Sequence, residues 1–169
     1  NSPLPQGNIA DIAFDTQGNK WIATEQGLYK FDDVTWTLYD TSNTGLIANW
    51  ITALLIDGTG TLWAGCEDGV LGDPAGLCSF DGTVWTPYTT ANSGLQEKLI
   101  RQLEMDTLGN LLVLSQGKGA ALFNPNGVQG YECIDRTLRT CIPTGVTELA
   151  EHDDPALTAF PNPFSNTTT

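Results

Sequence analysis

The chain has 169 residues, a formal net charge of −13 and a hydrophobic content of 40%. This length is enough for one domain with a real core, and the ordinary hydrophobic content argues against disorder. With seven Lys and Arg residues against 20 Asp and Glu residues, the chain would be repelled by a phosphate backbone, so nucleic-acid binding is not expected. No apolar run is long enough to indicate a membrane-spanning helix.

Three copies of one sequence unit follow one another along the chain, spaced by 42 and then 49 residues. The first half of the unit aligns Ile9, Ile51 and Ile100; Asp15, Asp57 and Asp106; Gly18, Gly60 and Gly109; and Trp21, Trp63 and Leu112. The second half aligns Phe31, Phe80 and Phe123; Trp36, Trp85 and Val128; and Tyr39, Tyr88 and Tyr131. The second copy is seven residues longer, and the extra residues fall at "LGDPAG" (71–76) and its edges.

Each copy predicts four short strands and no helix. Apolar residues alternate through the first strand, as in Ala10, Ile12 and Phe14, and an Asp-x-x-Gly turn ends it. The second, third and fourth strands are expected at 20–24, 28–31 and 35–39; at 62–66, 77–80 and 84–88; and at 111–115, 121–123 and 128–132. The recurring Asp residues are therefore interpreted as turn-formers rather than as a ring of catalytic carboxylates. The recurring Trp residues are expected in the core.

The segments "IADIAFDTQGNKWIATEQGLYKFD" and "WTLYDTSNTGL" resemble the two-component-regulator type of β-propeller repeat. The resemblance covers residues 1–131 and implies an all-β fold of about three four-stranded antiparallel blades, part of a larger propeller. Such repeats occur in periplasmic sensor regions of hybrid histidine kinases and in secreted surface proteins. The expected units are a connector at 1–8, blades at 9–50, 51–99 and 100–142, a linker at 143–158 and a further domain beginning at 159–169.

The first residues resemble the connectors between blades. Asn1, Asn43 and Asn92 each stand eight residues before the Ile that opens a copy. Because closed propellers have about four to eight blades, three blades cannot close a ring. We therefore expect further blades, supplied by the same chain or by another one.

The last segment, "AFPNPFSNTTT", resembles the opening strand of the C-terminal sorting domain of type IX secretion cargo. Pro161, Asn162, Pro163 and Phe164 match its characteristic element, and the rest of the small β-sandwich is absent from the sequence. The resemblance implies passage through the periplasm and an extracellular or outer-membrane surface location. It also implies that the outer-membrane translocon or a shuttle is a partner.

The four cysteines predict two local disulfides. Cys66 and Cys78 occupy the columns of Thr24 and Tyr29, which we expect to lie opposite one another in a hairpin. A second bridge would join Cys133 to Cys141, although four thiols permit three pairings. Disulfides fit an extracytoplasmic compartment. No metal or cofactor is expected, because no CxxC motif occurs and His152 is the one imidazole.

One end of the blades is the predicted binding rim. The turn between strands two and three lies at the same end of a blade as the connector to the next blade, and loops on a rigid scaffold commonly carry recognition. The candidate ligand-binding residues are Glu25, Gln26, Asn49, Trp50, Glu67, Asp68, Lys98 and Arg101. Trp50 could instead cap the core. The spacing of the candidate residues does not identify a ligand, although a glycan or a peptide suits the fold class.

The sequence predicts a secreted or cell-surface binding module. We expect this segment to be non-enzymatic, because one His outside the repeats rules out a Ser-His-Asp arrangement within it. Two alternatives remain at this point. One is the periplasmic ligand-sensing propeller of a hybrid two-component sensor, and the other is the non-catalytic part of a carbohydrate-active propeller enzyme.

Overall fold

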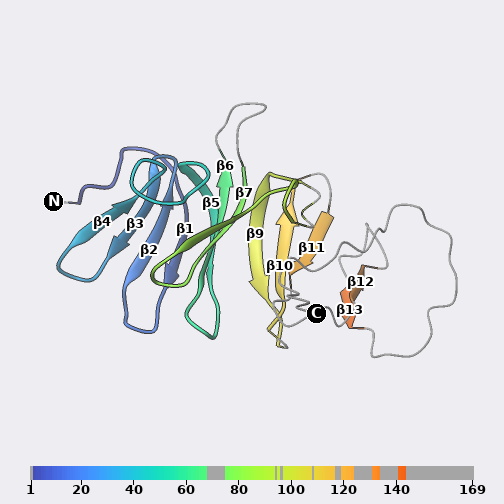
Figure 1. The fold of residues 1–169 in the computed structure, drawn as a ribbon. Coiled ribbons are helices and arrows are strands. Elements are labelled where there is room, and N and C mark those ends of the chain that lie inside the picture. The colour runs from blue at the N-terminus through green and yellow to red at the C-terminus, as the bar shows by residue number, and fades with distance from the viewer. Residues whose placement is uncertain are drawn as a thin grey trace, which may run out of the picture.

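The computed structural model describes residues 2–67, 75–93, 95, 97–107, 109–116, 119–123, 131–133 and 141–143, and the regular elements in these ranges are all β-strands (Figure 1). No helix among these residues could cross a membrane. The all-β class expected from the repeats is therefore confirmed.

The first two sheets along the chain each have four antiparallel strands, and the strands lie in the order of the sequence. The first blade consists of β1 (Ile9–Phe14), β2 (Lys20–Thr24), β3 (Gly27–Phe31) and β4 (Trp36–Tyr39). The second blade consists of β5 (Trp50–Ile56), β6 (Leu62–Glu67), β7 (Gly76–Phe80) and β8 (Trp85–Tyr88). These strands match the predicted ones in order and pairing.

The third sheet has three strands in its described part. These are β9 (Ile100–Met105), β10 (Leu111–Ser115) and β11 (Gly119–Phe123). The fourth strand of this blade was expected at 128–132, and the prediction of its pairing partner is wrong. Residues Tyr131–Cys133 form β12, which pairs with β13 (Cys141–Pro143) in a separate two-stranded sheet.

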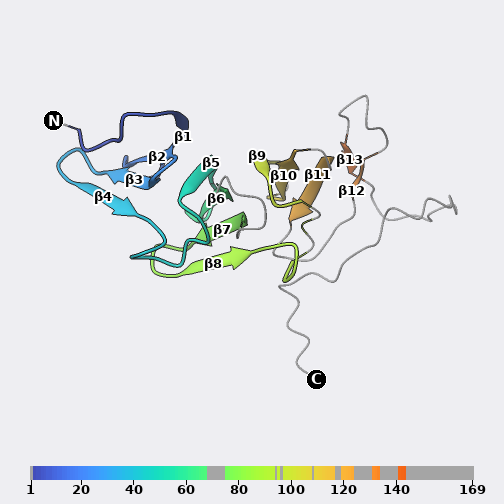
Figure 2. The same ribbon diagram turned by 90° about the horizontal axis from the view of Figure 1, so that it is seen from above.

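The three sheets lie side by side, with β1, β5 and β9 along one edge and β4 and β8 along the other (Figure 2). The face of each blade that points toward the following blade is called its front face here, and the opposite face its back face. The core between the first two blades joins the front face of one, with Trp21, Ala23 and Leu28, to the back face of the other, with Ile51 and Leu54.

The next core repeats this arrangement. The front-face residues Trp63, Leu77 and Tyr88 cover the back-face residues Ile100 and Leu103. Because both faces of the middle sheet are covered, its strands are apolar almost throughout rather than strictly alternating.

The Asp-x-x-Gly turn between the first two strands of a blade binds the core Trp directly. Asp57 Oδ1 accepts hydrogen bonds from the backbone N–H groups of Thr59 at 2.9 Å and Thr61 at 3.0 Å, while Oδ2 accepts one from Trp63 Nε1 at 2.9 Å. Asp15 makes the same bond to Trp21 Nε1 at 3.0 Å. Gly60 has a φ of 89°, a conformation that favours Gly over other residues. The interpretation of these carboxylates as turn-formers is confirmed.

Burial tends to raise the pKa of Asp57, but hydrogen bonds from Thr59 and Trp63 outweigh it, and the net pKa lies below the ordinary 3.8. A carboxyl whose pKa is lowered by folding stabilises the folded state above its unfolded pKa, and this contribution disappears as the pH falls through the folded pKa.

We therefore expect Asp57→Ala to lower the free energy of unfolding at neutral pH by about 1–3 kcal/mol, because it leaves Trp63 Nε1 and turn N–H groups without their acceptor. The difference from wild type should shrink below pH 3.8. Urea titrations between pH 7 and pH 2.5 measure it. Asp33→Asn is the control, since Asp33 is exposed and pairs only with Lys20 at the surface. Equal effects of the two substitutions would contradict this account of the turn.

Candidate functional site

The predicted rim lies at the end of the blades where the β2–β3 turn and the connector from β4 to β5 meet, at the top of Figure 1. In the second blade, β6 ends at Glu67 and β7 begins at Gly76 at this same end. The rim therefore gathers loops from neighbouring blades, as expected from the topology.

One cluster at the rim crosses the boundary between the second and third blades. Arg101 Nη1 forms an ion pair with Glu67 Oε2 at 3.2 Å, and Arg101 Nε donates to Gln116 Oε1 at 2.8 Å. Trp50 is the residue directly opposite Glu67 in the β5–β6 pair. We call Trp50, Glu67, Arg101 and Gln116 the rim cluster.

The packing of the cluster leaves its cation accessible. The side chain of Arg101 is 47% exposed, whereas that of Glu67 is 12% exposed. Glu67 thus fixes the guanidinium from the protein side while one face remains open to solvent. Such a planar cation can donate paired hydrogen bonds to the oxygens of a ligand. Trp50, opposite Glu67 in the β5–β6 pair, is half-buried and is the aromatic residue of the cluster.

A repeated irregularity of the first strand of each blade places Arg101 at the rim. The register of β9 against β10 skips Arg101, just as the β1–β2 pair skips Ala10 and the β5–β6 pair skips Thr52. A β-bulge of this kind bends the strand and re-aims a side chain. The three blades therefore share a bulge at this position, and among Ala10, Thr52 and Arg101 the third-blade residue alone is a cation.

Gln116 is the member of the cluster that the sequence reasoning missed. It occupies the repeat column of Glu25 and Glu67, so the alignment of the three copies contained the signal. Its backbone N–H also donates to Leu99 O at 2.8 Å, which fixes the turn that carries it.

The other predicted site residues are not members of the rim cluster. Glu25 and Gln26 are exposed in the β2–β3 turn of the first blade, where Glu25 accepts a hydrogen bond from Asn8 Nδ2 at 3.1 Å. Asn49 is used within its connector, since its Oδ1 accepts from Thr41 N at 2.8 Å. Lys98 is half-buried in the next connector. Asp68 lies outside the described residues.

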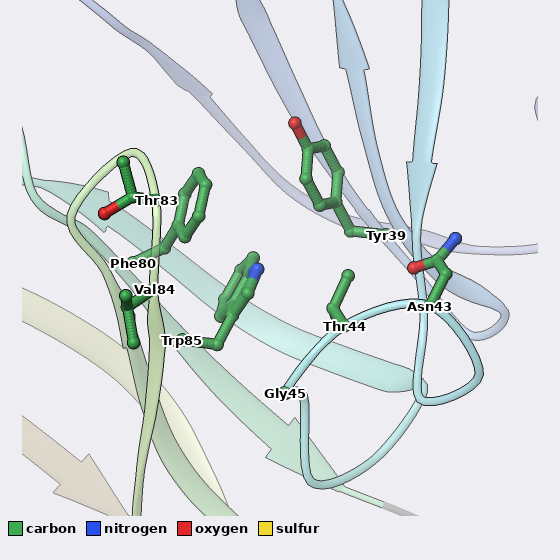
Figure 3. A pocket seen from close by; sticks show the side chains of 8 residues that line it. All are labelled: Tyr39, Asn43, Thr44, Gly45, Phe80, Thr83, Val84 and Trp85. Atoms are coloured by element: carbon green, nitrogen blue, oxygen red, sulfur yellow. The ribbon is translucent and has the colours of Figure 1, made fainter.

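A hollow of about 390 Å³ opens between the first and second blades near β4 and β8 (Figure 3). It is lined by Tyr39, Asn43, Thr44, Gly45, Phe80, Thr83, Val84 and Trp85. The rings of Phe80 and Trp85 stack at a centroid distance of 4.7 Å on one side, and Tyr39 and Thr44 face them from the other. The sequence predicts Trp85 in the core and predicts no hollow at this place.

The side chains of Asn43, Thr44 and Thr83 in this aromatic hollow are already hydrogen-bonded within the protein. Asn43 Nδ2 donates to Leu38 O at 2.9 Å, Thr44 Oγ1 donates to Asp40 O at 2.7 Å, and Thr83 Oγ1 donates to Asp81 Oδ1 at 2.7 Å. A ligand in the hollow would therefore meet mainly apolar contacts. The rim cluster is the better candidate for recognising a polar molecule.

The expected register of the cysteine pair is wrong. Cys66 lies opposite Gly76, and Cys78 lies opposite Ala64, so the two cysteines are diagonal neighbours in the β6–β7 pair. The reason is visible in the first blade, where Thr24 pairs with Gly27 and not with Tyr29. In this structure both thiols are free and buried.

The two thiols nevertheless lie in contact. They share a hydrogen bond, which together with burial raises the pKa of the Cys66 thiol. The bridge between them stays a prediction. Cys133 and Cys141 face one another directly in the register of β12 and β13, which agrees with the spacing expected for a bridge without testing it. The sorting element at Pro161, Asn162, Pro163 and Phe164 lies outside the described residues.

No metal site emerges from the part of the chain that the structure describes, where no group of three or more His, Cys, Asp or Glu residues could hold an ion.

Comparisons with known proteins identify the fold. The sequence model of the family described as "Two component regulator propeller" matches residues 45–68. The structure resembles the extracellular domains of two hybrid two component systems from B. thetaiotaomicron: BT4673, with a TM-score of 0.58 and 27% identity, and BT3049, with a TM-score of 0.58 and 21% identity. These likenesses cover 70% and 69% of this chain but 17% and 15% of those chains. The search of curated proteins finds no match.

The chain therefore has the fold of β-propeller blades, as the repeats predict. It spans less than a fifth of the length of the solved domains that it resembles.

The disulfide prediction can be tested on protein exported to an oxidising compartment. We expect Cys66 and Cys78 to resist alkylation in denaturant until a reductant is added, and a linked peptide to appear in a non-reduced digest. In Cys66→Ala, Cys78 should become alkylated at once while the reactivity of Cys133 and Cys141 stays unchanged. Immediate alkylation of both Cys66 and Cys78 in the wild-type protein would refute the bridge.

Proposed function

We propose that this chain is part of the extracytoplasmic sensing propeller of a two-component system and that it recognises a polar ligand through the rim cluster. The observation that carries the proposal is the exposed guanidinium of Arg101, held by Glu67 and Gln116 at the boundary of two blades. The 27% identity to an extracellular domain of a hybrid two component system supports a sensor context and a location outside the cytoplasm.

The chemistry of the cluster suits a glycan. Sugars present adjacent hydroxyl groups that can accept from a guanidinium and donate to a carboxylate, and their apolar faces pack on aromatic rings such as that of Trp50. Binding is the proposed activity of this segment, with no catalytic step assigned to it. A peptide ligand, with its carboxylate or carbonyl groups, is the second candidate for the same site.

A second context for the module is export by the type IX secretion system. The sequence observation that favours it is the Pro-Asn-Pro-Phe element at 161–164, which would address the protein to the outer-membrane translocon or its shuttle. Sequencing of the gene beyond the codon of Thr169 tests the two contexts against one another. A β-sandwich supports secreted cargo at the cell surface, and a membrane helix followed by a kinase region supports a sensor.

Substitution of the rim cluster tests the binding proposal. We expect Arg101→Ala to weaken glycan binding about tenfold or more, because charge-assisted hydrogen bonds to the ligand are lost, and to leave the melting temperature nearly unchanged. Glycan and peptide arrays followed by calorimetry on the retained ligand provide the measurement. A selective signal on the peptide array would favour the second ligand class.

Lys20→Ala is the matched control, since Lys20 is also a surface cation in an ion pair but begins β2 at the opposite end of the first blade. It should bind as the wild type does. If Arg101→Ala and the wild type bind the same ligand equally well, the rim cluster is not the site.

A further inference from the structure

Three aromatic rings from two blades meet at the aromatic hollow. Tyr39 lies on the front face of the first blade, and the stacked Phe80 and Trp85 lie on the back face of the second (Figure 3). The ring centroid of Tyr39 lies 5.8 Å from that of Phe80 and 6.1 Å from that of Trp85. All three residues are half-buried and line the hollow, so a ligand there can contact more than one ring.

Two carboxylates stand beside the hollow without a cation to neutralise them. Asp40 Oδ1 accepts a hydrogen bond from the backbone N–H of Asn43 at 3.2 Å, and Asp81 Oδ1 accepts one from Thr83 Oγ1 at 2.7 Å. Asn43 and Thr83 both line the hollow. Neither carboxylate forms an ion pair with another described residue, and no Lys or Arg is among the described residues that line the hollow. Because both Asp side chains are charged at neutral pH, the hollow lies in a negative field.

The first blade shows that a stacked Phe–Trp pair of this repeat accepts a cation. Phe31 and Trp36, in the columns of the stacked pair of the second blade, stack at a centroid distance of 4.4 Å. The ammonium group of Lys20 lies over Phe31, 6.0 Å from its ring centroid, and forms an ion pair with Asp33. The attraction comes from the negative face of the aromatic ring.

The second blade keeps the two rings and lacks the cation. The buried Leu62 stands in the column of Lys20, and Gly82 stands in the column of Asp33. In the part of the chain that the structure describes, no cation lies over any of the three rings that line the hollow. The aromatic faces there are therefore available to a cation that comes from outside the chain.

Lys30 limits where such a cation can lie. Its Nζ is 5.2 Å from the ring centroid of Trp21, and Trp21 packs against Tyr39 at a centroid distance of 5.3 Å. Trp21 is not among the residues that line the hollow. Because like charges repel, a second cation is expected over Tyr39 and Trp85 and not beside Lys30.

We propose that the aromatic hollow binds a quaternary ammonium group, as in a choline-type small molecule. Such a cation is attracted to aromatic faces and has no N–H donors, so it needs no hydrogen-bond acceptor. This suits a lining in which the side chains of Asn43, Thr44 and Thr83 are already hydrogen-bonded. A primary ammonium fits less well, because Gly82 stands in the column of the acceptor Asp33.

The hollow is a site separate from the rim cluster. Its volume of about 390 Å³ lies within the range of small-molecule sites. It opens near β4 and β8 at the boundary of the first and second blades, whereas the rim cluster joins the second blade to the third. Binding in the hollow is therefore independent of the function proposed for the rim cluster.

Calorimetric titration of the 169-residue chain with choline tests this proposal. We expect choline to bind, and dimethylbutanol, its uncharged carbon isostere, to bind about tenfold or more weakly, because only the cation is attracted to the ring faces. Arg101→Ala should leave the choline affinity unchanged. No choline binding at millimolar concentration, or equal binding of the two probes, would overturn the proposal.

A matched pair of substitutions locates the bound cation. We expect Trp85→Leu to weaken choline binding about tenfold, because it keeps an apolar side chain and removes the aromatic face. Trp36→Leu is the control, since Trp36 holds the same column of the first blade and makes the same stack. It should lower the melting temperature by a similar amount and leave the choline affinity unchanged. Equal affinity losses in the two variants would overturn the assignment to the hollow.

A charge substitution tests the site without removing a ring. Asp81→Asn keeps an oxygen that can accept from Thr83 and removes the negative charge. We expect choline affinity to fall about twofold to threefold at low salt, with a smaller difference at high salt. Asp32→Asn, in the same column of the first blade, should not change the affinity. Equal losses in the two Asp variants would contradict binding beside Asp81.

Discussion

The structure depends on one packing constraint, namely that the back faces of the second and third blades are covered by the Trp, Leu and Tyr columns of the preceding blade. A four-stranded sheet with two apolar faces cannot bury both by itself, so the stable unit is a stack of sheets. The middle blade shows the consequence most clearly, because Trp63 and Leu77 on one face and Ile51 and Leu54 on the other are all buried. Blade order and blade spacing therefore follow from the same few columns.

The candidate site inherits its geometry from this packing. Gly65 permits the close approach of the second and third blades, since a Cβ at this position would lie 2.9 Å from both Ile100 Cγ2 and Thr52 Oγ1. Thr52 Oγ1 in turn donates to Ile100 O at 2.7 Å across the boundary. Arg101 follows Ile100 directly, so the same contacts that join the blades set the position of the guanidinium.

Much of the fold could be predicted from the sequence, because each aligned column of the repeat has a single structural role. The Asp column forms turns, the column of Trp21 and Trp63 fills the core, and the Gly column takes positive φ. The second Trp column, Trp36 and Trp85, is half-buried, so its placement in the core was wrong. The prediction failed where pairing depends on the length of a turn. The two-residue turn at Glu25 and Gln26 sets Thr24 against Gly27, and column spacing alone does not reveal this.

The third blade marks a second limit of the sequence reasoning. Leu112 replaces the Trp, and the carboxylate of Asp106 binds Asn110 Nδ2 at 2.7 Å. The turn therefore persists without the ring that it positions in the other blades. The Tyr131 column matched the repeat, yet the strand at Tyr131–Cys133 takes Cys141–Pro143 as its partner. A recurring residue type predicts the position of a residue in the repeat unit. It does not predict which of several available strands the segment pairs with.

The rim and the core contribute differently to the free energy of folding. A partly exposed ion pair such as Arg101–Glu67 contributes little to folding, whereas the buried columns between blades contribute most of it. Arg101 can therefore exchange some of its contacts for those of a ligand without loosening the stack. Because the cluster joins residues of two blades, a ligand held there also contacts both sides of the boundary. At this candidate site Arg101 can thus change its hydrogen-bonding partners while the packed blades keep its position fixed. Selective recognition on a rigid scaffold requires this combination.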